Sequence, residues 1–226
     1  MTRKLFVTAI FSALACAMPA HAAVIASSDF ATGDEGWTIG EFTGIGPNLT
    51  PTYDPIGQLI STGDVAANVA FIASSAYLGD QSGAFGGSIS FDLSDASNDG
   101  TNYSPLSLTG AGITLYARPT PPPSTTALSA FNISLVGASF VTSDPFGTSG
   151  ATATDAQLLA VLADLDQLAI LADWQSGGDF SQLDNVVLSD GATAVPEPAA
   201  WALMIGGFGL AGTALRRARP KLAFAG

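Results

Sequence analysis

The stretch Ser88-Ile89-Ser90-Phe91-Asp92-Leu93 decides the fold class, because polar and apolar side chains alternate along it. Successive side chains of a β-strand point to opposite faces of a sheet, so this alternation predicts a strand with one buried and one solvated face. A similar alternation returns in segments 113–117, 133–135 and 168–174, and turn residues recur at intervals of about ten residues. The pattern predicts an all-β domain.

One short helix is expected among these strands. Thr154 and Gln157 have the spacing of a capping box, in which each side chain bonds the backbone amide of the other residue. Four apolar residues then follow at helical spacing: Leu158, Val161, Leu162 and Leu165. We therefore predict a helix over residues 154–165, with this apolar stripe packed on a sheet.

The N-terminus has the composition of a signal peptide. Arg3 and Lys4 precede an apolar run, and Ala20-His21-Ala22 fits the small-x-small rule for cleavage. We expect signal peptidase to remove residues 1–22 by cutting after Ala22, so that the chain is exported. A lipoprotein interpretation would use Cys16, but Ala13 stands where a larger aliphatic residue is usual.

The C-terminus has the composition of a transmembrane helix. Residues 199–215 carry no charge and would span roughly 25 Å as a helix, close to the thickness of a bilayer core. The linker before them, residues 191–198, contains Pro196 and Pro198, which are excluded from a helix interior. The tail 216–226 holds a basic cluster: Arg216, Arg217, Arg219 and Lys221. This cluster predicts a cytoplasmic tail.

The segment that runs from Pro196-Glu197-Pro198 through Trp201 to Arg216-Arg217 resembles the PEP-CTERM sorting signal. The resemblance implies that an exosortase, a membrane protease, processes the chain near Pro-Glu-Pro. It also implies a Gram-negative bacterium that makes exopolysaccharide. The protein would be anchored transiently in the inner membrane and then reach the cell-envelope surface or the extracellular matrix. Without the resemblance, a plain tail anchor would explain the same segment.

Removal of the signal peptide takes away most side chains that catalysis commonly uses. The only Cys and the only His lie within residues 1–22, and Arg118 is the one basic residue between positions 23 and 190. Nucleophilic triads, Schiff bases and metals bound by imidazole or thiolate are thereby excluded from the exported domain. A glycosidase with paired carboxylates remains as the alternative, but the sequence marks no acid for that role. We expect no catalysis.

The exported domain is strongly acidic. Residues 23–190 contain 18 of the chain's 19 Asp and Glu residues, which gives a formal charge of about −17. Nucleic acids and anionic lipid surfaces are bound through Lys and Arg, so neither is an expected partner of this domain. Carboxylate oxygens favour Ca²⁺ instead, although solubility alone would also explain the charge.

A second resemblance is carried by the order of several short motifs. They are Tyr77-Leu78-Gly79-Asp80, Phe85-Gly86-Gly87, segment 108–115, segment 157–165, segment 168–172 and Leu183-Asp184-Asn185-Val186. In this order they resemble the laminin B domain, also called laminin IV type A, over roughly residues 60–190. The resemblance implies a jelly-roll-like β-sandwich over residues 23–190, related in shape to carbohydrate-binding modules. The cysteine-rich repeats that flank the domain in laminins are absent, so laminin-type partners are not expected.

Two constellations are candidate calcium sites. Asp95, Ser97 and Asp99 have the spacing of a calcium loop, but an ordinary turn explains them equally well and the bidentate acid of a full loop is missing. Asp29 and Asp184 lie near the two ends of the domain. Acids on the first and last strands often hold a structural Ca²⁺ in sandwich modules that resemble this one, whereas a turn or cap role for Asp184 is the alternative.

One further pair is a candidate ligand site. Tyr116 and Arg118 share the strand face opposite Ile113 and Leu115, so they are expected to point outward and offer a ring and a guanidinium to a saccharide. Covering the sheet is the alternative role for such a pair. The sequence thus predicts an exported, non-catalytic structural or adhesive protein associated with exopolysaccharide or biofilm. A carbohydrate-binding module for a specific glycan is the first alternative.

Overall fold

The computed structural model describes residues 22–142, 150–191, 205–210 and 213, and the chain divides into two units. One unit is Ala22–Ala192, and the other comprises Met1–His21 and Thr193–Gly226. In the second unit residues 205–210 and Thr213 are helical. The described part of the chain contains no helix that is both long and apolar enough to cross a membrane. The remainder of the predicted signal peptide, linker, transmembrane helix and basic tail lies outside the described residues.

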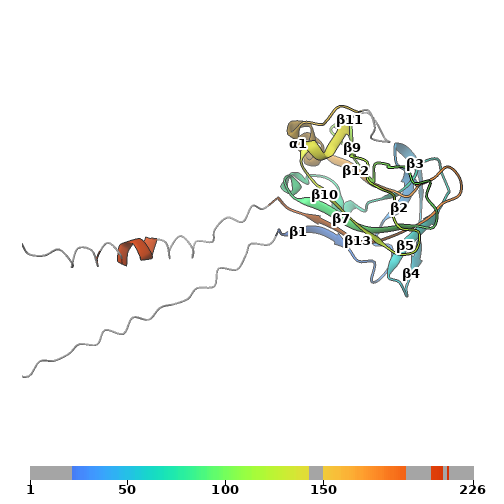
Figure 1. Cartoon of the computed structure of the whole chain (residues 1–226), viewed down its shortest axis with the longest axis horizontal. Helices are drawn as coiled ribbons and strands as arrows, with labels where there is room; N and C mark the ends of the chain where they lie inside the picture. Colours follow the sequence, from blue (N-terminus) through green and yellow to red (C-terminus); the bar gives the residue numbers. More distant parts are fainter. Residues whose placement is uncertain (1–21, 143–149, 192–204, 211–212, 214–226) are drawn as a thin grey trace, which may run out of the picture. The chain divides into compact units, whose positions relative to one another are not determined.

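The unit Ala22–Ala192 consists of two antiparallel sheets (Figure 1). The first has the order β10-β7-β13-β5-β4, with β1 also paired to β13, and the second has the order β11-β9-β8-β12-β6-β2-β3. The first sheet contains β1 (Val24–Ser28), β4 (Thr52–Asp54), β5 (Leu59–Gly63), β7 (Ser88–Asp95), β10 (Ser129–Ser134) and β13 (Phe180–Ser189). The second contains β2 (Thr38–Glu41), β3 (Gly44–Leu49), β6 (Val69–Ile72), β8 (Leu106–Gly110), β9 (Ile113–Ala117), β11 (Phe140–Thr142) and β12 (Leu165–Leu171). Short 3₁₀ turns are η1 (Ser75–Tyr77), η2 (Ser82–Ala84) and η3 (Gly137–Ser139).

Strand β7 confirms the alternation that decided the fold class. Ile89, Phe91 and Leu93 are at most 1% exposed and face the other sheet, whereas Ser88, Ser90 and Asp92 are half-buried on the outer face. The strand pairs with β10 on one side and β13 on the other, so its backbone hydrogen bonds are satisfied along both edges.

The core between the sheets is rich in aromatic side chains. Trp37 and Trp174 are at most 1% exposed and are among its largest buried side chains. The rings of Phe91 and Phe131 stack with centroids 5.1 Å apart, and Trp174 lies 6.2 Å from Phe131. Every residue of the core cluster belongs to the unit Ala22–Ala192, so this unit is expected to fold by itself.

The ends of this unit are joined by hydrogen bonds. The backbone amide of Asp190 donates to the Ala23 carbonyl at 2.9 Å, and the Ala23 amide donates to Asp190 Oδ1 at 2.7 Å. Strand β1 continues the pairing, with Ser28 opposite Val186. The Tyr77 hydroxyl donates to the Val186 carbonyl at 3.0 Å and so connects η1 to β13.

The predicted capping box is confirmed. The Gln157 amide donates to Thr154 Oγ1 at 3.2 Å, and the Thr154 amide donates to Gln157 Oε1 at 2.9 Å. The helix α1 (Asp155–Ala163) is shorter than predicted, because Leu165 already belongs to β12, where its amide donates to the Gly79 carbonyl. The predicted strand 168–174 is displaced by three residues. Strand β12 begins at Leu165 and ends at Leu171, and Trp174 lies in the loop that follows.

We predict that Gly110→Ala destabilises the domain. A Cβ atom at Gly110 would overlap the carbonyl oxygens of Val161 and Asp164, which close the end of α1 over β8. We expect the free energy of unfolding to fall by about 1–3 kcal/mol, measured by urea titration. Gly83→Ala is the matched control, because nothing lies within 4 Å of its Cβ position. Equal stability of the two variants would contradict this packing.

Candidate functional site

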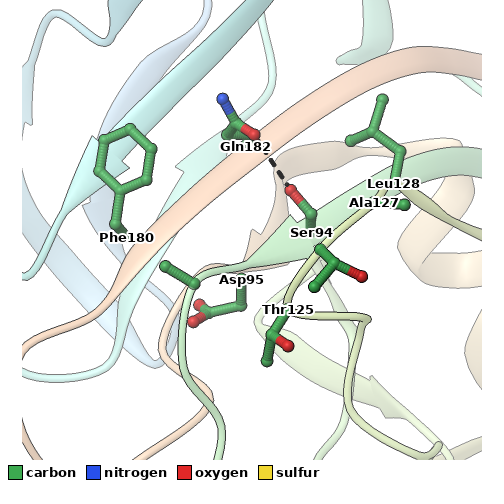
Figure 2. Close-up of a pocket in the computed structure, with 9 residues that line it drawn as sticks. Ser94, Asp95, Thr125, Ala127, Leu128, Phe180 and Gln182 are labelled. Carbon is green, nitrogen blue, oxygen red and sulfur yellow. Dashed lines mark hydrogen bonds between the residues drawn. The ribbon is translucent and has the colours of Figure 1, made fainter.

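A groove lies on the outer face of the first sheet, between β7, β13 and the loop that precedes β10 (Figure 2). On β13, Leu183 and Ser181 are fully buried and face inward, so Phe180 and Gln182 point outward. The groove has a volume of about 140 Å³. Its lining residues are Ser94, Asp95, Ala96, Thr125, Thr126, Ala127, Leu128, Phe180 and Gln182.

The polar part of this groove is held by hydrogen bonds. Ser94 and Gln182 are directly opposite each other on neighbouring strands, and the Ser94 hydroxyl donates to Gln182 Oε1 at 3.3 Å. Figure 2 shows the Gln182 nitrogen pointing away from Ser94. The loop side is fixed because the Ser124 amide donates to Ser129 Oγ at 2.8 Å. The amide nitrogen of Gln182 is thereby oriented, and Thr125 of the loop lies on the other side of Ser94 (Figure 2).

A carboxyl group with a raised pKa lies below the groove. The Ser181 hydroxyl makes a short hydrogen bond with Asp95 Oδ2 and contacts the Ala172 carbonyl at 3.0 Å. A hydroxyl has one proton to donate, and Ser181 donates it to the Asp95 carboxylate, which is the shorter of the two contacts. Burial raises the pKa of Asp95 to about 6, although the hydrogen bond from Ser181 opposes the rise, so this carboxyl group takes up a proton in mild acid.

A carboxyl pair lies in the loop between β12 and β13. Asp179 Oδ2 accepts from the Trp174 amide at 2.6 Å and from the Gln175 amide at 3.3 Å, which turns the chain after β12. Among the described residues no hydroxyl or N–H donates to Asp179 Oδ1, although it is buried. Burial raises the pKa of Asp179, and burial together with the hydrogen bond to Asp179 raises that of Asp173 to about 6. A proton on Asp173 is the donor that fits this pair.

These carboxyl groups predict that the domain is most stable in mild acid. When folding raises the pKa of a carboxyl group, the folded state binds more protons than the unfolded state at any pH between the unfolded-state pKa and the folded-state pKa. The free energy of unfolding therefore falls as the pH rises through that interval. The free energy of unfolding should fall by on the order of 1–2 kcal/mol between about pH 4 and pH 7. Asp95 and Asp173, each raised from 3.8 to about 6, account for this window.

The measurement is the urea midpoint as a function of pH. Asp95→Asn should flatten the dependence, since an amide does not titrate in this range and its oxygen still accepts from Ser181. Asp166→Asn, at an exposed position of β12, is the control for loss of a negative charge. A midpoint that rises between pH 4 and pH 7 would contradict the assignment of protons to these carboxyl groups.

The residues of the predicted calcium loop form a series of turns, and calcium at Asp95, Ser97 and Asp99 stays a prediction. Asp95 Oδ1 accepts from the Ser97 amide at 2.9 Å, and Asp99 Oδ1 accepts from the Thr101 amide at 2.8 Å. The second oxygen of Asp95 faces Ser181, while that of Asp99 accepts from the Tyr103 hydroxyl at 2.7 Å. The carboxylates of Asp95 and Asp99 thus point to different protein donors, as the turn interpretation expects.

The second candidate calcium site brings three acids near one another. Burial raises the pKa of Asp184, and the carboxylates of Asp92 and Asp29 add to the effect. Asn185, at a bulge with φ +50°, donates its amide to Asp92 Oδ2 at 2.9 Å and to Asp184 Oδ2 at 3.1 Å. Over the described ranges, no group of three or more His, Cys, Asp or Glu side chains is arranged to hold a metal ion. Calcium at Asp29 and Asp184 stays a prediction.

A thermal-unfolding experiment tests that prediction. A bound Ca²⁺ stabilises the folded state, so the midpoint should be several degrees higher in calcium than in chelator. Asp184→Asn should remove the difference, and Asp166→Asn should keep it. An identical midpoint in calcium and in chelator would contradict calcium binding. The hydrogen bonds from the Asn185 side-chain amide would then be enough to hold Asp92 and Asp184 together.

The predicted outward platform of Tyr116 and Arg118 is not formed. The Tyr116 side chain is only 7% exposed, because Phe42 covers it with ring centroids 5.9 Å apart. Arg118 donates to the Ala138 carbonyl at 2.7 Å and to Thr152 Oγ1 at 2.6 Å. The guanidinium thus connects the residue after β9 to η3 and to the segment that precedes α1. The expectation of an exposed ring beside it was wrong.

The groove itself was not predicted. Its floor pairs Ser94 with Gln182, which are 88 positions apart, so only the strand register brings them together. The sequence signal was the alternation of Phe180 and Gln182 with Ser181 and Leu183. The sorting residues Pro196, Glu197, Pro198, Trp201, Arg216 and Arg217 lie outside the described residues. Ala22, the predicted cleavage point, precedes β1 and is exposed.

Comparison with known protein families identifies two segments. A family model described as Laminin B (Domain IV) matches residues 70–202. A second model, described as the PEP-CTERM protein-sorting motif, matches residues 194–219. No curated protein matches the chain.

Among solved structures, the chain is similar to the L4b domain of human laminin alpha-2. That similarity has a TM-score of 0.60 and 12% identity, over 76% of this chain and 100% of the other. It shows a shared fold and confirms the predicted β-sandwich. An exo-beta-agarase matches with a TM-score of 0.40 and 15% identity, over 74% of this chain and 24% of the other. The N-terminal cellulose-binding domain of Cellulomonas fimi beta-1,4-glucanase C matches with a TM-score of 0.36 and 13% identity, over 76% of this chain and 99% of the other. Both scores are too low to carry an argument.

Proposed function

Because the chain belongs to the Laminin B (Domain IV) family and carries a PEP-CTERM sorting motif, we propose that it is an exported, non-catalytic structural protein of the cell envelope. Within that role, its sandwich acts as an adhesive component of an exopolysaccharide or biofilm matrix. The observation that carries the proposal is the presence of both segments in one chain. The motif implies processing by exosortase, and the domain is a structural fold rather than a catalytic one.

The chemistry of the sandwich supports a non-catalytic role. Between residues 23 and 190 the sequence has no His, Cys or Lys. The carboxyl groups with the most strongly raised pKa, Asp95 and Asp173, are bonded to Ser181 and Asp179 in positions that hold strands and loops. A paired-carboxylate glycosidase needs its two acids on either side of an open substrate cleft. The alternative of a glycosidase therefore has no support from these acids.

A carbohydrate-binding module is the second candidate function. The groove on the first sheet favours it, since the groove combines an exposed aromatic ring with neutral hydrogen-bonding groups. This candidate is compatible with the first, because a matrix protein that binds polysaccharide is also an adhesive component. The two differ in whether the domain recognises a defined glycan.

Delivery to the matrix can be tested in the producing bacterium. Replacement of Pro196-Glu197-Pro198 by three alanines should leave the chain unprocessed in the membrane fraction and deplete it from the matrix fraction. Fractionation followed by intact-mass measurement reads out both effects. Pro119→Ala, a proline substitution inside the sandwich, is the control. Normal maturation and normal matrix levels of the triple-alanine variant would refute exosortase-dependent delivery.

A further inference from the structure

We infer that the groove on the first sheet binds a segment of an uncharged polysaccharide, with Phe180 as the stacking platform. The inference depends on the proposed function only for the cellular location, the cell-envelope matrix, in which the protein would encounter this polysaccharide. The binding itself follows from three features of the groove: its aromatic wall, its polar floor and its charge.

The aromatic wall is Phe180. This side chain is 46% exposed on the outer face of β13, and it is the only exposed aromatic among the described residues of the unit Ala22–Ala192. A phenyl ring left in water loses the free energy that burial would provide, so its position beside a groove favours a role in binding. Leu128, which is 38% exposed, also lines the groove. Figure 2 shows Phe180 and Leu128 on opposite sides of Gln182.

The floor supplies hydrogen bonds without charge. The Ser94 hydroxyl holds Gln182 Oε1, which leaves the amide nitrogen as an oriented donor. Thr125 and Thr126 add hydroxyl groups from the loop side. A sugar ring has apolar C–H faces and a rim of hydroxyl groups. An apolar wall beside a few placed polar groups is therefore complementary to it.

The charge of the groove excludes acidic glycans. No basic residue lines it, and its one acid, Asp95, points to Ser181 below the floor. Between residues 23 and 190 the formal charge is about −17, so a uronate or sulfate group would be repelled and would find no guanidinium to pair with. An uncharged saccharide meets neither obstacle.

The size of the groove favours a chain segment over a complete small ligand. Its volume of about 140 Å³ is smaller than the roughly 300–1,000 Å³ of pockets that enclose small molecules. A short part of a longer polymer lying across the sheet suits such a shallow site, and repetition of weak contacts along the polymer would then raise the overall affinity.

Isothermal titration of the unit Ala22–Ala192 with hexasaccharides tests the inference. The uncharged probes are β-1,4-glucan, β-1,3-glucan, α-1,4-glucan and β-1,4-galactan hexasaccharides, and the charged probe is the galacturonan hexasaccharide. We expect at least one uncharged probe to bind and the galacturonan not to bind. Phe180→Ala should weaken that binding by about tenfold, and Phe180→Trp should preserve it.

Leu159→Ala is the matched control, because Leu159 is an apolar side chain of similar exposure, 39%, on α1 and away from the groove. Unchanged urea midpoints would show that the variants are folded. The inference is overturned if no uncharged probe binds, if Phe180→Ala binds as well as the unaltered domain, or if galacturonan binds best. Any of these results, obtained while the chain still reaches the matrix fraction, removes the groove as a glycan site and leaves the proposed structural function standing.

Discussion

The alternation of side chains along β13 constrains both the core and the candidate site. Ser181 and Leu183 face the interior, whereas Phe180 and Gln182 face outward. A shift of register by one residue would exchange the two sets, removing the apolar contact inside and the groove outside together. The pairing of β13 with β7 on one side and with β5 and β1 on the other fixes that register.

The buried carboxyl groups follow from the scarcity of cations. In most proteins a buried acid is paired with Arg or Lys, but the only basic residue between positions 23 and 190 is Arg118, which bonds to Ala138 and Thr152. Asp95 and Asp173 lie elsewhere, with hydroxyl, amide and carboxyl neighbours. In mild acid protons take the place of the missing counter-ions, so that the interior of this acidic domain responds to pH through the raised pKa values of these two groups.

The sequence was informative where structure depends on neighbours along the chain. The alternation of Ile89, Phe91 and Leu93 and the capping box at Thr154 are local patterns, and both are confirmed. Local patterns failed where a distant segment covers a surface. Tyr116 was expected to point into solvent because its strand alternates, but Phe42 from another part of the chain lies over it. The groove could not be predicted from the sequence for a related reason. Its floor joins Ser94 of β7 to Gln182 of β13, which are 88 positions apart.

The central position of β13, between β7 on one edge and β5 and β1 on the other, has a mechanical consequence. Tension applied to the domain at its C-terminal side enters through β13, whose hydrogen bonds to neighbours on both edges run across the direction of pull. Such bonds are loaded in shear, so many must break at once, whereas a strand pulled at an edge unzips one bond at a time. The arrangement suits a protein whose load arrives through one end, because the strand that receives the force is the one held by the most partners.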